Sequence, residues 1–558
     1  MVQLPADCIQ EILKFLDNNL FSCLLINRRW CRNTVPLIWN NPFRFEGLSD
    51  KKNLRFLDNY LKSLNQEEND WLEQKGIVLG HEQPILFDYA SFLEVIKFDK
   101  LDLTIKNWVD YFYFDFKVPK MIFLEKGEYY INILAVLFKL FMRQSKSIRS
   151  LFISEIMSLP TVTRIKFPDC STFSLAVPGI KEVKDVNFNF SYKVNPYKKI
   201  FEVISTTCTQ IQNLSLSFPY NVRLKNLPHF NNSLINMIKN QTKLESITLK
   251  FIMFNLIELK SVFSSLNLHI NWIRKIELNY FEINLMDFSL IFSKKSNNQP
   301  IELSLLDCVL YLYVENHEQI YEFEEIKLPV DSLKILFEND HSLIYQPILL
   351  QIVGENLRNL SLNKLDEDTI RYILGYCTNI TSLEIVDLQR MDLSDILMII
   401  KELQISKLKL SFNDTGLPLP ESIVSDFLLN LSFNLPTTLT SLVLGNLQKF
   451  WYLQNFLENF EAPKLREIIL LQVPMNFLTF IDSFKNFDHY LELLIVRNIH
   501  LFGIEFEGMI GKYELDQVKQ HVAKNEFTCK LKFVKKVNGN VGFYIGGKLN
   551  FYDTFITT

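Results

Sequence analysis

Two stretches of the sequence, CTQIQNLSL (residues 208–216) and CTNITSLEI (residues 377–385), carry the same pattern. In each stretch a cysteine is followed three residues later by an apolar residue, and the next apolar residues stand three and five positions beyond it. Apolar residues at alternate positions are typical of a strand that buries one of its faces. The sequence therefore predicts two short strands in equivalent structural settings.

The same spacing of apolar residues recurs from residue 90 onward. Its central residues are Ile96, Leu151, Val186, Leu214, Ile247, Ile276, Leu360, Leu383, Leu408, Leu442, Ile468 and Leu494. Because 48% of the chain is hydrophobic, such a pattern also arises by chance, so its period is the better evidence. Positions 360, 383 and 408 are 23 and 25 residues apart, and positions 442, 468 and 494 are 26 apart. This period of about 20–29 residues is typical of leucine-rich repeats.

Residues 91–499 thus resemble an irregular leucine-rich repeat of about 11 to 14 units. The resemblance implies an α/β solenoid with parallel strands on the concave side and helices, such as 368–376 and 393–403, on the convex side. No single repeat buries its own face, so the units must stack. The register across 301–337 is ambiguous, and the asparagine that usually follows the strand is mostly missing. A conventional multi-domain α/β protein is the alternative.

The N-terminal residues 1–42 carry a second pattern. Leu-Pro opens an apolar helix, a polar break precedes a second short helix, and Arg-x-Trp and Leu-x-Trp follow. Three helices in about forty residues bury little core, which favours a unit that needs a partner. The elements stand at Leu4-Pro5, Ile9/Ile12/Leu16, Asn18 to Leu20, Cys23/Ile26, Arg28 to Trp30 and Leu37 to Trp39.

This order of elements resembles the F-box. A helical hairpin without that function shares the apolar spacing but lacks the opening Leu-Pro and both tryptophans. The resemblance implies docking to the adaptor of a cullin-based (SCF-type) ubiquitin ligase. The implied adaptor-binding residues are Leu4, Pro5, Ile9, Ile12, Leu16, Leu20 and Leu24. The implied core residues of the F-box are Trp30, Leu37 and Trp39.

Two further segments flank the repeats. Residues 43–90 read as a helical connector, with a helix at 53–64 and a solvated polar loop at 66–70. Residues 500–558 read as a C-terminal cap, since solenoid ends need a polar cover. Within this cap we expect a helix at 514–524 and a β-hairpin around Asn538-Gly539.

Composition narrows the class of protein. The chain has 558 residues and a net charge of −4, so no global positive charge points to nucleic acid. The longest apolar run, 129–142, is too short for a bilayer, and no signal peptide is visible. The eight cysteines lack metal-site spacing, which favours buried free thiols in a soluble cytosolic or nuclear protein.

Motifs for catalysis are weak or missing. Gly542, Gly547 and Lys548 have phosphate-loop spacing, but Leu549 follows where a metal-binding Ser or Thr is needed. No His-Glu-x-x-His or Gly-x-Ser-x-Gly string occurs. Cys8, Cys23 and Cys31 read as core-filling thiols on apolar helix faces. We therefore expect no metal, no cofactor and no catalytic site.

Taken together, these features predict a non-catalytic substrate receptor. The F-box would hold the adaptor and, through it, a cullin, and the repeats would bind a protein substrate, with no nucleic acid or membrane involved. A protein-interaction scaffold outside any ligase needs the same surfaces and remains the alternative. An acidic run between Tyr311 and His341 reads as a solvated face, or as a surface that steers a basic partner.

Overall fold

The computed structural model divides into two units. The first contains Met1–Phe281 and Leu290–Gln299, and the second contains Glu282–Ser289 and Pro300–Thr558. Each unit is described by itself. The structure describes residues 4–16, 20–43, 50–79, 85–115, 123–154, 180–189, 198–218, 227–251, 259–293, 299–313, 327–337, 344–412, 419–447, 453–474, 501–507, 530–535 and 541–546.

Three helices open the first unit: α1 (Ala6–Lys14), α2 (Leu20–Cys23) and α3 (Arg28–Trp39). Pro5 precedes α1, where a backbone N–H has no partner within the helix, so its missing N–H costs no helical hydrogen bond. The Pro5 carbonyl accepts the Ile9 N–H. The Asn27 side chain caps α3 by accepting the backbone N–H groups of Arg29 and Trp30. Both α1 and α2 pack on α3.

Four longer helices follow in the first unit. They are α4 (Asp50–Leu61), α5 (Gln66–Gln74), α6 (Phe98–Asp115) and α7 (Phe123–Gln144). Helix α4 corresponds to the helix expected at 53–64, and α7 contains the apolar run 129–142. Helices α4 and α6 pack together, as do α6 and α7.

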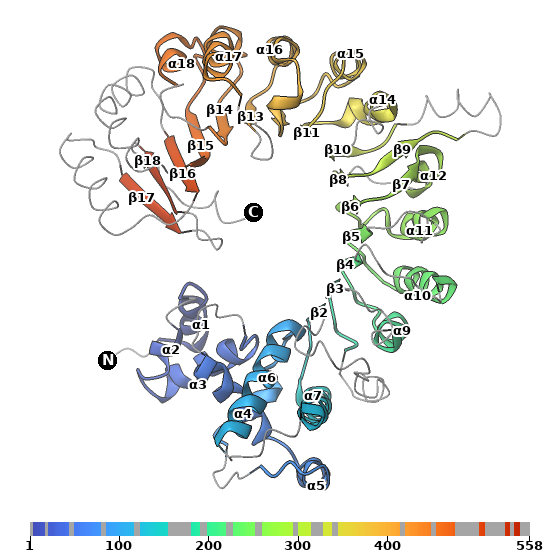
Figure 1. The fold of residues 1–558 in the computed structure, drawn as a ribbon, viewed down its shortest axis with the longest axis vertical. Helices are drawn as coiled ribbons and strands as arrows, with labels where there is room; N and C mark the ends of the chain where they lie inside the picture. The colour runs from blue at the N-terminus through green and yellow to red at the C-terminus, as the bar shows by residue number, and fades with distance from the viewer. Residues whose placement is uncertain are drawn as a thin grey trace. The chain divides into compact units, whose positions relative to one another are not determined.

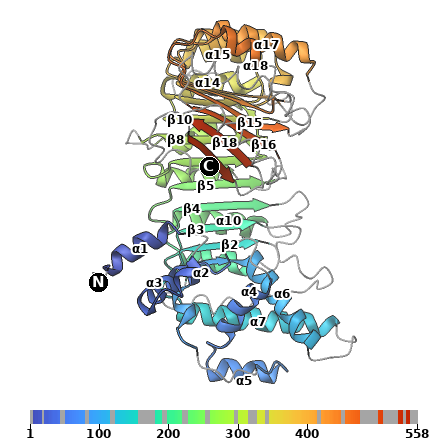
Figure 2. The ribbon, with the colours of Figure 1, turned by 90° about the vertical axis from the view of Figure 1, so that its left-hand side faces the viewer.

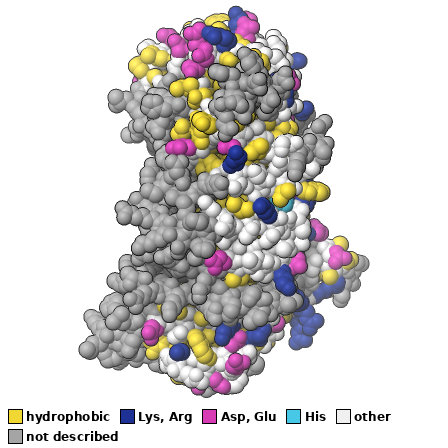
Figure 3. Space-filling view, turned by 90° about the vertical axis from the view of Figure 1, so that its right-hand side faces the viewer, with side chains coloured by type: hydrophobic (Ala, Val, Ile, Leu, Met, Phe, Trp, Pro, Cys, Tyr) yellow, Lys and Arg dark blue, Asp and Glu magenta, His cyan; other side chains and the backbone are white. Residues whose placement is uncertain are grey.

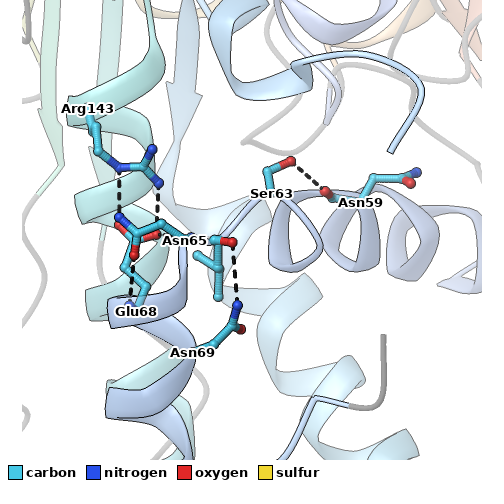
Figure 4. A network of polar contacts seen from close by, with 7 residues as sticks. Asn59, Ser63, Asn65, Glu68, Asn69 and Arg143 are labelled. Atoms are coloured by element: carbon cyan, nitrogen blue, oxygen red, sulfur yellow. Dashed lines mark hydrogen bonds and ion pairs between the residues drawn. The ribbon is translucent and has the colours of Figure 1, made fainter. Parts of the chain in front are cut away.

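The prediction of a solvated loop at 66–70 is wrong, because these residues form the first turns of α5. Asn65 and Glu68 make a capping box in which each side chain bonds the other's backbone N–H. The buried Glu68 carboxylate also accepts two hydrogen bonds from Arg143 of α7, the shorter at 2.8 Å (Figure 4). The polar residues at the start of α5 thus cap this helix and, through Glu68, pair it with α7.

A row of parallel strands occupies the rest of the first unit. The strands are β1 (Val95–Lys97), β2 (Ser150–Ser154), β3 (Asp185–Asn189), β4 (Asn213–Phe218), β5 (Ser246–Phe251) and β6 (Lys275–Asn279). Each pairs in parallel with the next. The helical elements beside them are η2 (Tyr89–Phe92), α9 (Lys198–Thr207), α10 (Leu227–Lys239), α11 (Leu259–Leu266), η4 (Asn267–His269) and η5 (Leu290–Phe292).

The second unit contains a similar parallel row. Its strands are β8 (Ile301–Leu306), β10 (Val330–Leu336), β11 (Asn359–Leu362), β12 (Ser382–Ile385), β13 (Lys407–Ser411), β14 (Ser441–Gly445), β15 (Glu467–Pro474) and β16 (Leu501–Glu507). The helical elements are α12 (Leu285–Ser289), α14 (Gln346–Val353), η7 (Gly354–Asn356), α15 (Glu367–Tyr376), η8 (Leu388–Arg390), α16 (Leu393–Glu402), α17 (Glu421–Asn434) and α18 (Leu453–Asn459).

Register explains why the apolar pattern recurs. Within the first unit the central residues Ile96, Leu151, Val186, Leu214, Ile247 and Ile276 are direct cross-strand partners. Within the second unit Leu333, Leu360, Leu383, Leu408, Leu442 and Ile468 align in the same way. All of these side chains are buried. The helices lie along one side of the strands in each row (Figures 1 and 2).

The mixed α/β class, with a large parallel sheet and many helices, is therefore confirmed. The helices expected at 368–376 and 393–403 are α15 and α16. The ambiguous stretch 301–337 holds two parallel strands, β8 and β10, whose register shifts between Val330 and Ser332. A separate parallel pair, β7 (Glu282–Asn284) with β9 (Val309–Tyr311), was not predicted.

At the C-terminal end the expected hairpin strands are present. Strand β17 (Lys530–Lys535) pairs antiparallel with β18 (Val541–Gly546), and β18 pairs antiparallel with β16. The repeat expected around Leu494 and the helix expected at 514–524 lie outside the described residues.

Candidate interaction surfaces

Large apolar side chains stand exposed on the N-terminal helices. They belong to α1, to the residues that flank it, and to the turn between α2 and α3. The exposed fractions are 46% for Leu4, 39% for Ile12, 86% for Phe15, 89% for Leu25 and 55% for Ile26. Burying one such side chain is worth about 1.5–3 kcal/mol, so this group, hereafter the α1–α2 apolar surface, favours association with a partner.

Helix α1 carries apolar residues on two faces. Ile9 and Leu13, one turn apart, are buried where α1 packs on α3. Ile12 lies on a different face of the same helix and remains exposed, as does Leu4, which stands two residues before the helix begins. Helical phase separates the two sets, because Ile12 and Leu13 are adjacent in sequence and therefore about 100° apart around the helix axis.

The seven residues implied as adaptor contacts are therefore not equivalent. Leu4, Pro5 and Ile12 are exposed, Leu16 and Leu24 are half-buried, and Ile9 and Leu20 are buried in the unit's own core. The sequence prediction missed Phe15, Leu25 and Ile26, the three most exposed apolar side chains of this region.

The three residues implied as core lie within α3. Trp30 and Leu37 are half-buried, and Trp39 is buried. The Trp39 ring stacks on Tyr89 with centroids 4.1 Å apart and contacts Phe56 edge-on. Trp39 therefore joins the N-terminal helices to the segments that follow.

Backbone hydrogen bonds continue this connection into the strand row. The Asn40 carbonyl, one residue beyond α3, accepts the N–H groups of Glu94 and Val95, each at 2.9 Å. Val95 is the first residue of β1. The end of α3 is thus hydrogen-bonded to the first strand, which favours a fixed orientation of the helices relative to that strand.

The solvent sides of the strands differ between the units. In β3 to β5 they carry mainly Asn, Ser and Thr, for example Asn187, Ser215 and Thr248 in direct register. In β10 to β13 they carry lysines, including Lys334 and Lys409. Both faces therefore offer polar groups, but only the second concentrates positive charge.

Cysteine placement corrects one prediction. Cys8 is exposed rather than core-filling, whereas Cys23 is buried and Cys31 is intermediate. Cys208 and Cys377, the cysteines of the two quoted stretches, are buried, and burial raises the pKa of each thiol to about 12. Their Sγ–H groups donate to the carbonyls of Ile180 and Leu350 in the preceding repeat. Both thiols are thus packing groups and not nucleophiles.

The remaining candidates from the sequence are metal ligands, histidines and the phosphate-loop string at 542–548. Among the residues that the structure describes, no three His, Cys, Asp or Glu side chains are placed to hold a metal ion. His269 is buried, bonds the Ile238 carbonyl at 2.8 Å, and has its pKa lowered by burial. Gly542 lies within strand β18, whereas Gly547 and Lys548 lie outside the described residues.

Three further observations concern charge and hydropathy. On the face shown in Figure 3, basic and acidic side chains are interspersed. No helix in the described ranges is long and apolar enough to cross a membrane. Of the acidic run, Asp331 forms an ion pair with Arg358 at 3.5 Å, and Glu315, Glu318, Glu322, Glu324, Glu325, Glu338 and Asp340 lie outside the described residues.

Comparison with known proteins adds no assignment: no protein-family model matches the chain, and no curated protein matches it.

Proposed function

We propose that the chain is the substrate-recognition subunit of a cullin-based (SCF-type) ubiquitin ligase. The observation that carries the proposal is the α1–α2 apolar surface, with Phe15 and Leu25 almost fully exposed. A helical segment that leaves its largest side chains in water is suited to dock on an apolar groove of another protein. Its sequence order resembles the F-box, whose partner is the ligase adaptor.

The fold supports this assignment. In the proposal, residues 1–42 form the F-box, 43–90 the connector, 91–499 an irregular leucine-rich-repeat solenoid, and 500–558 a C-terminal cap. The support is the one-to-one parallel pairing of consecutive strands within each unit, with helices between them. Each repeat then contacts mainly its neighbours, which is how solenoids accumulate stability.

The mechanism requires no catalytic side chain in this chain. The N-terminal helices hold the adaptor, the strand rows hold the substrate, and a substrate lysine stays near the ubiquitin-charged enzyme. Tethering raises the effective concentration of the lysine at the thioester, which accelerates transfer without new chemistry. The two hydrogen bonds that Glu94 and Val95 donate to the Asn40 carbonyl support this role, because a fixed junction preserves the geometry.

Affinity capture of the full chain from cells, followed by mass spectrometry, tests the proposal. We expect the wild-type chain to bring down an adaptor and a cullin, and Phe15→Ser/Leu25→Ser to lose both. Phe433→Ser is the matched control, because Phe433 is 58% exposed on α17 and belongs to neither N-terminal helix nor turn. Equal capture by both variants would contradict the proposal, and an adaptor without a cullin would favour the scaffold alternative.

A further inference from the structure

Three lysines stand on the solvent side of four neighbouring strands in the second unit. They are Lys334 on β10 and Lys407 and Lys409 on β13. The alternate positions on these strands, such as Leu333, Leu383 and Leu408, are buried, which fixes the lysines on the opposite face. We call this face, β10 to β13, the lysine face.

The other solvent-side residues of the lysine face are small or neutral, with one exception. Cross-strand register places serines or an asparagine beside the lysines, with Glu384 on β12 as the exception. At the start of β10 the half-buried Asp331 accepts a hydrogen bond from Asn359 and forms an ion pair with Arg358. Because the Asp331–Arg358 pair is neutral, the three lysines and Glu384 leave a local charge of +2 on these strands, in a chain whose net charge is −4. Lys407 is exposed, and Lys334 and Lys409 are half-buried.

Glu384 already has its partners. Its carboxylate lies 2.5 Å from the Lys409 ammonium and accepts a hydrogen bond from Ser361 at 2.8 Å. Burial alone would raise the pKa of Glu384, but the hydrogen bond and charge of Lys409, with Ser361 and Lys334, hold it below its ordinary value. Glu384 is therefore ionised at neutral pH and orients Lys409, while its charge offsets only one of the three lysines.

Lys407 is placed differently from Lys409. Its cross-strand partners are Ser382 and Ser441, and its side chain is exposed. Within the described ranges Lys407 makes no ion pair. An ammonium group bordered by hydroxyl-bearing residues can accept a carboxylate without first breaking an internal pair.

We propose that the lysine face binds an acidic, carboxylate-bearing segment of the substrate protein. Charge complementarity selects this occupant, since the net positive charge that remains after Glu384 is counted favours an anionic chain over a basic or apolar one. The corresponding face of β3 to β5 in the first unit lacks this concentration of lysines. That the bound segment belongs to a substrate rests on the proposed function, whereas binding of an acidic segment can be measured independently of that function.

Strand geometry predicts the spacing of the acidic residues. Lys334 and Lys409 are three strands apart, which is about 14 Å at a strand separation of about 4.8 Å. An extended chain rises about 3.3 Å per residue, so a segment crossing the strands spans this distance in about four residues. The lysine face is therefore matched to carboxylates about four residues apart.

Fluorescence anisotropy of the full chain with a labelled peptide tests the inference. The probe is an extended peptide of serine, threonine and proline with glutamate at every fourth position, and its partner probe has glutamine there instead. We expect the glutamate peptide to bind at low ionic strength and to weaken as salt rises. Lys407→Glu should lower its affinity by about tenfold or more, because reversal adds repulsion to the lost attraction.

Lys401→Glu is the matched control, because Lys401 is exposed near the end of α16, on the helix side of the same repeats. Equal loss with this variant would mean that only net charge matters and would overturn the inference. Equal binding of the glutamine peptide, or no binding of the glutamate peptide at low ionic strength, would also overturn it. Phe15→Ser/Leu25→Ser should leave peptide binding unchanged, so failure of adaptor capture and failure of the lysine face are distinguishable.

Discussion

The N-terminal helices and the strand rows use the same apolar residue types in opposite ways. Along the strands, leucine and isoleucine at the central positions are buried between strand and helix. Phe15, just after α1, and Leu25, in the turn before α3, are almost fully exposed. The difference teaches that apolar content alone does not locate a core. Helical or strand phase, and the neighbouring layer, decide which side chains stabilise the fold and which remain for a partner.

The largest effect on stability is expected in the strand row. Leu214 is buried and lies in register between Val186 and Ile247. Leu214→Ala should lower the free energy of unfolding by about 3 kcal/mol, because it removes apolar contacts and leaves a cavity. Denaturant unfolding measures this change. A loss below about 0.5 kcal/mol would show that the row is not the closely packed core described here.

A smaller loss is expected at the ion pair between α5 and α7. Arg143→Leu leaves the buried Glu68 carboxylate with only its capping contacts from Asn65. We expect a loss of about 2 kcal/mol, the typical cost of removing a partner from a buried charged group. The double variant Arg143→Leu/Glu68→Gln should recover part of that loss, and no recovery would argue against the pair as its cause.

How much the sequence predicts depends on the element. Strand positions are predictable because a repeated parallel register imposes the same apolar spacing each time, as at Leu360, Leu383 and Leu408. The start of α5 was missed because five polar residues resemble a loop unless the Asn65–Glu68 capping pair is recognised. The pair β7–β9 was missed because its strands are three residues long, too short for a periodic signal.

The candidate surface was predictable only in part. The order of motifs located it, and Leu4, Pro5 and Ile12 are exposed as docking requires. Ile9 and Leu20 are buried, since packing of α1 and α2 on α3 selects which apolar residues face inward. A list by residue type cannot show that choice, because it depends on how the three helices contact one another.

Acid titration should reveal a third, smaller effect at Glu384. The pKa of this residue is below its ordinary value in the folded chain, so its ionic interactions stabilise the fold above the ordinary glutamate pKa. That contribution is lost as the pH falls from the ordinary value through the lower folded value. Glu384→Gln should therefore reduce the acid dependence of the unfolding free energy in this window. An unchanged dependence would show that the Lys409 contact contributes nothing.

The smallest effect on stability is expected on the α1–α2 apolar surface. Phe15→Ser and Leu25→Ser remove side chains that contact mainly water, so each should change the free energy of unfolding by less than about 0.5 kcal/mol. Denaturant unfolding of both variants checks this value. A loss comparable with that of Leu214→Ala would mean that these side chains belong to the core and would remove the contrast between the two regions.

Hydrogen–deuterium exchange of the full chain, with and without a purified ligase adaptor, tests the central claim most directly. We predict that the adaptor slows exchange in peptides covering residues 4–16 and 20–26, while the strands from β2 to β5 exchange as before. Protection confined to the strand rows, or no protection anywhere, would contradict the assignment of the N-terminal helices as the docking element.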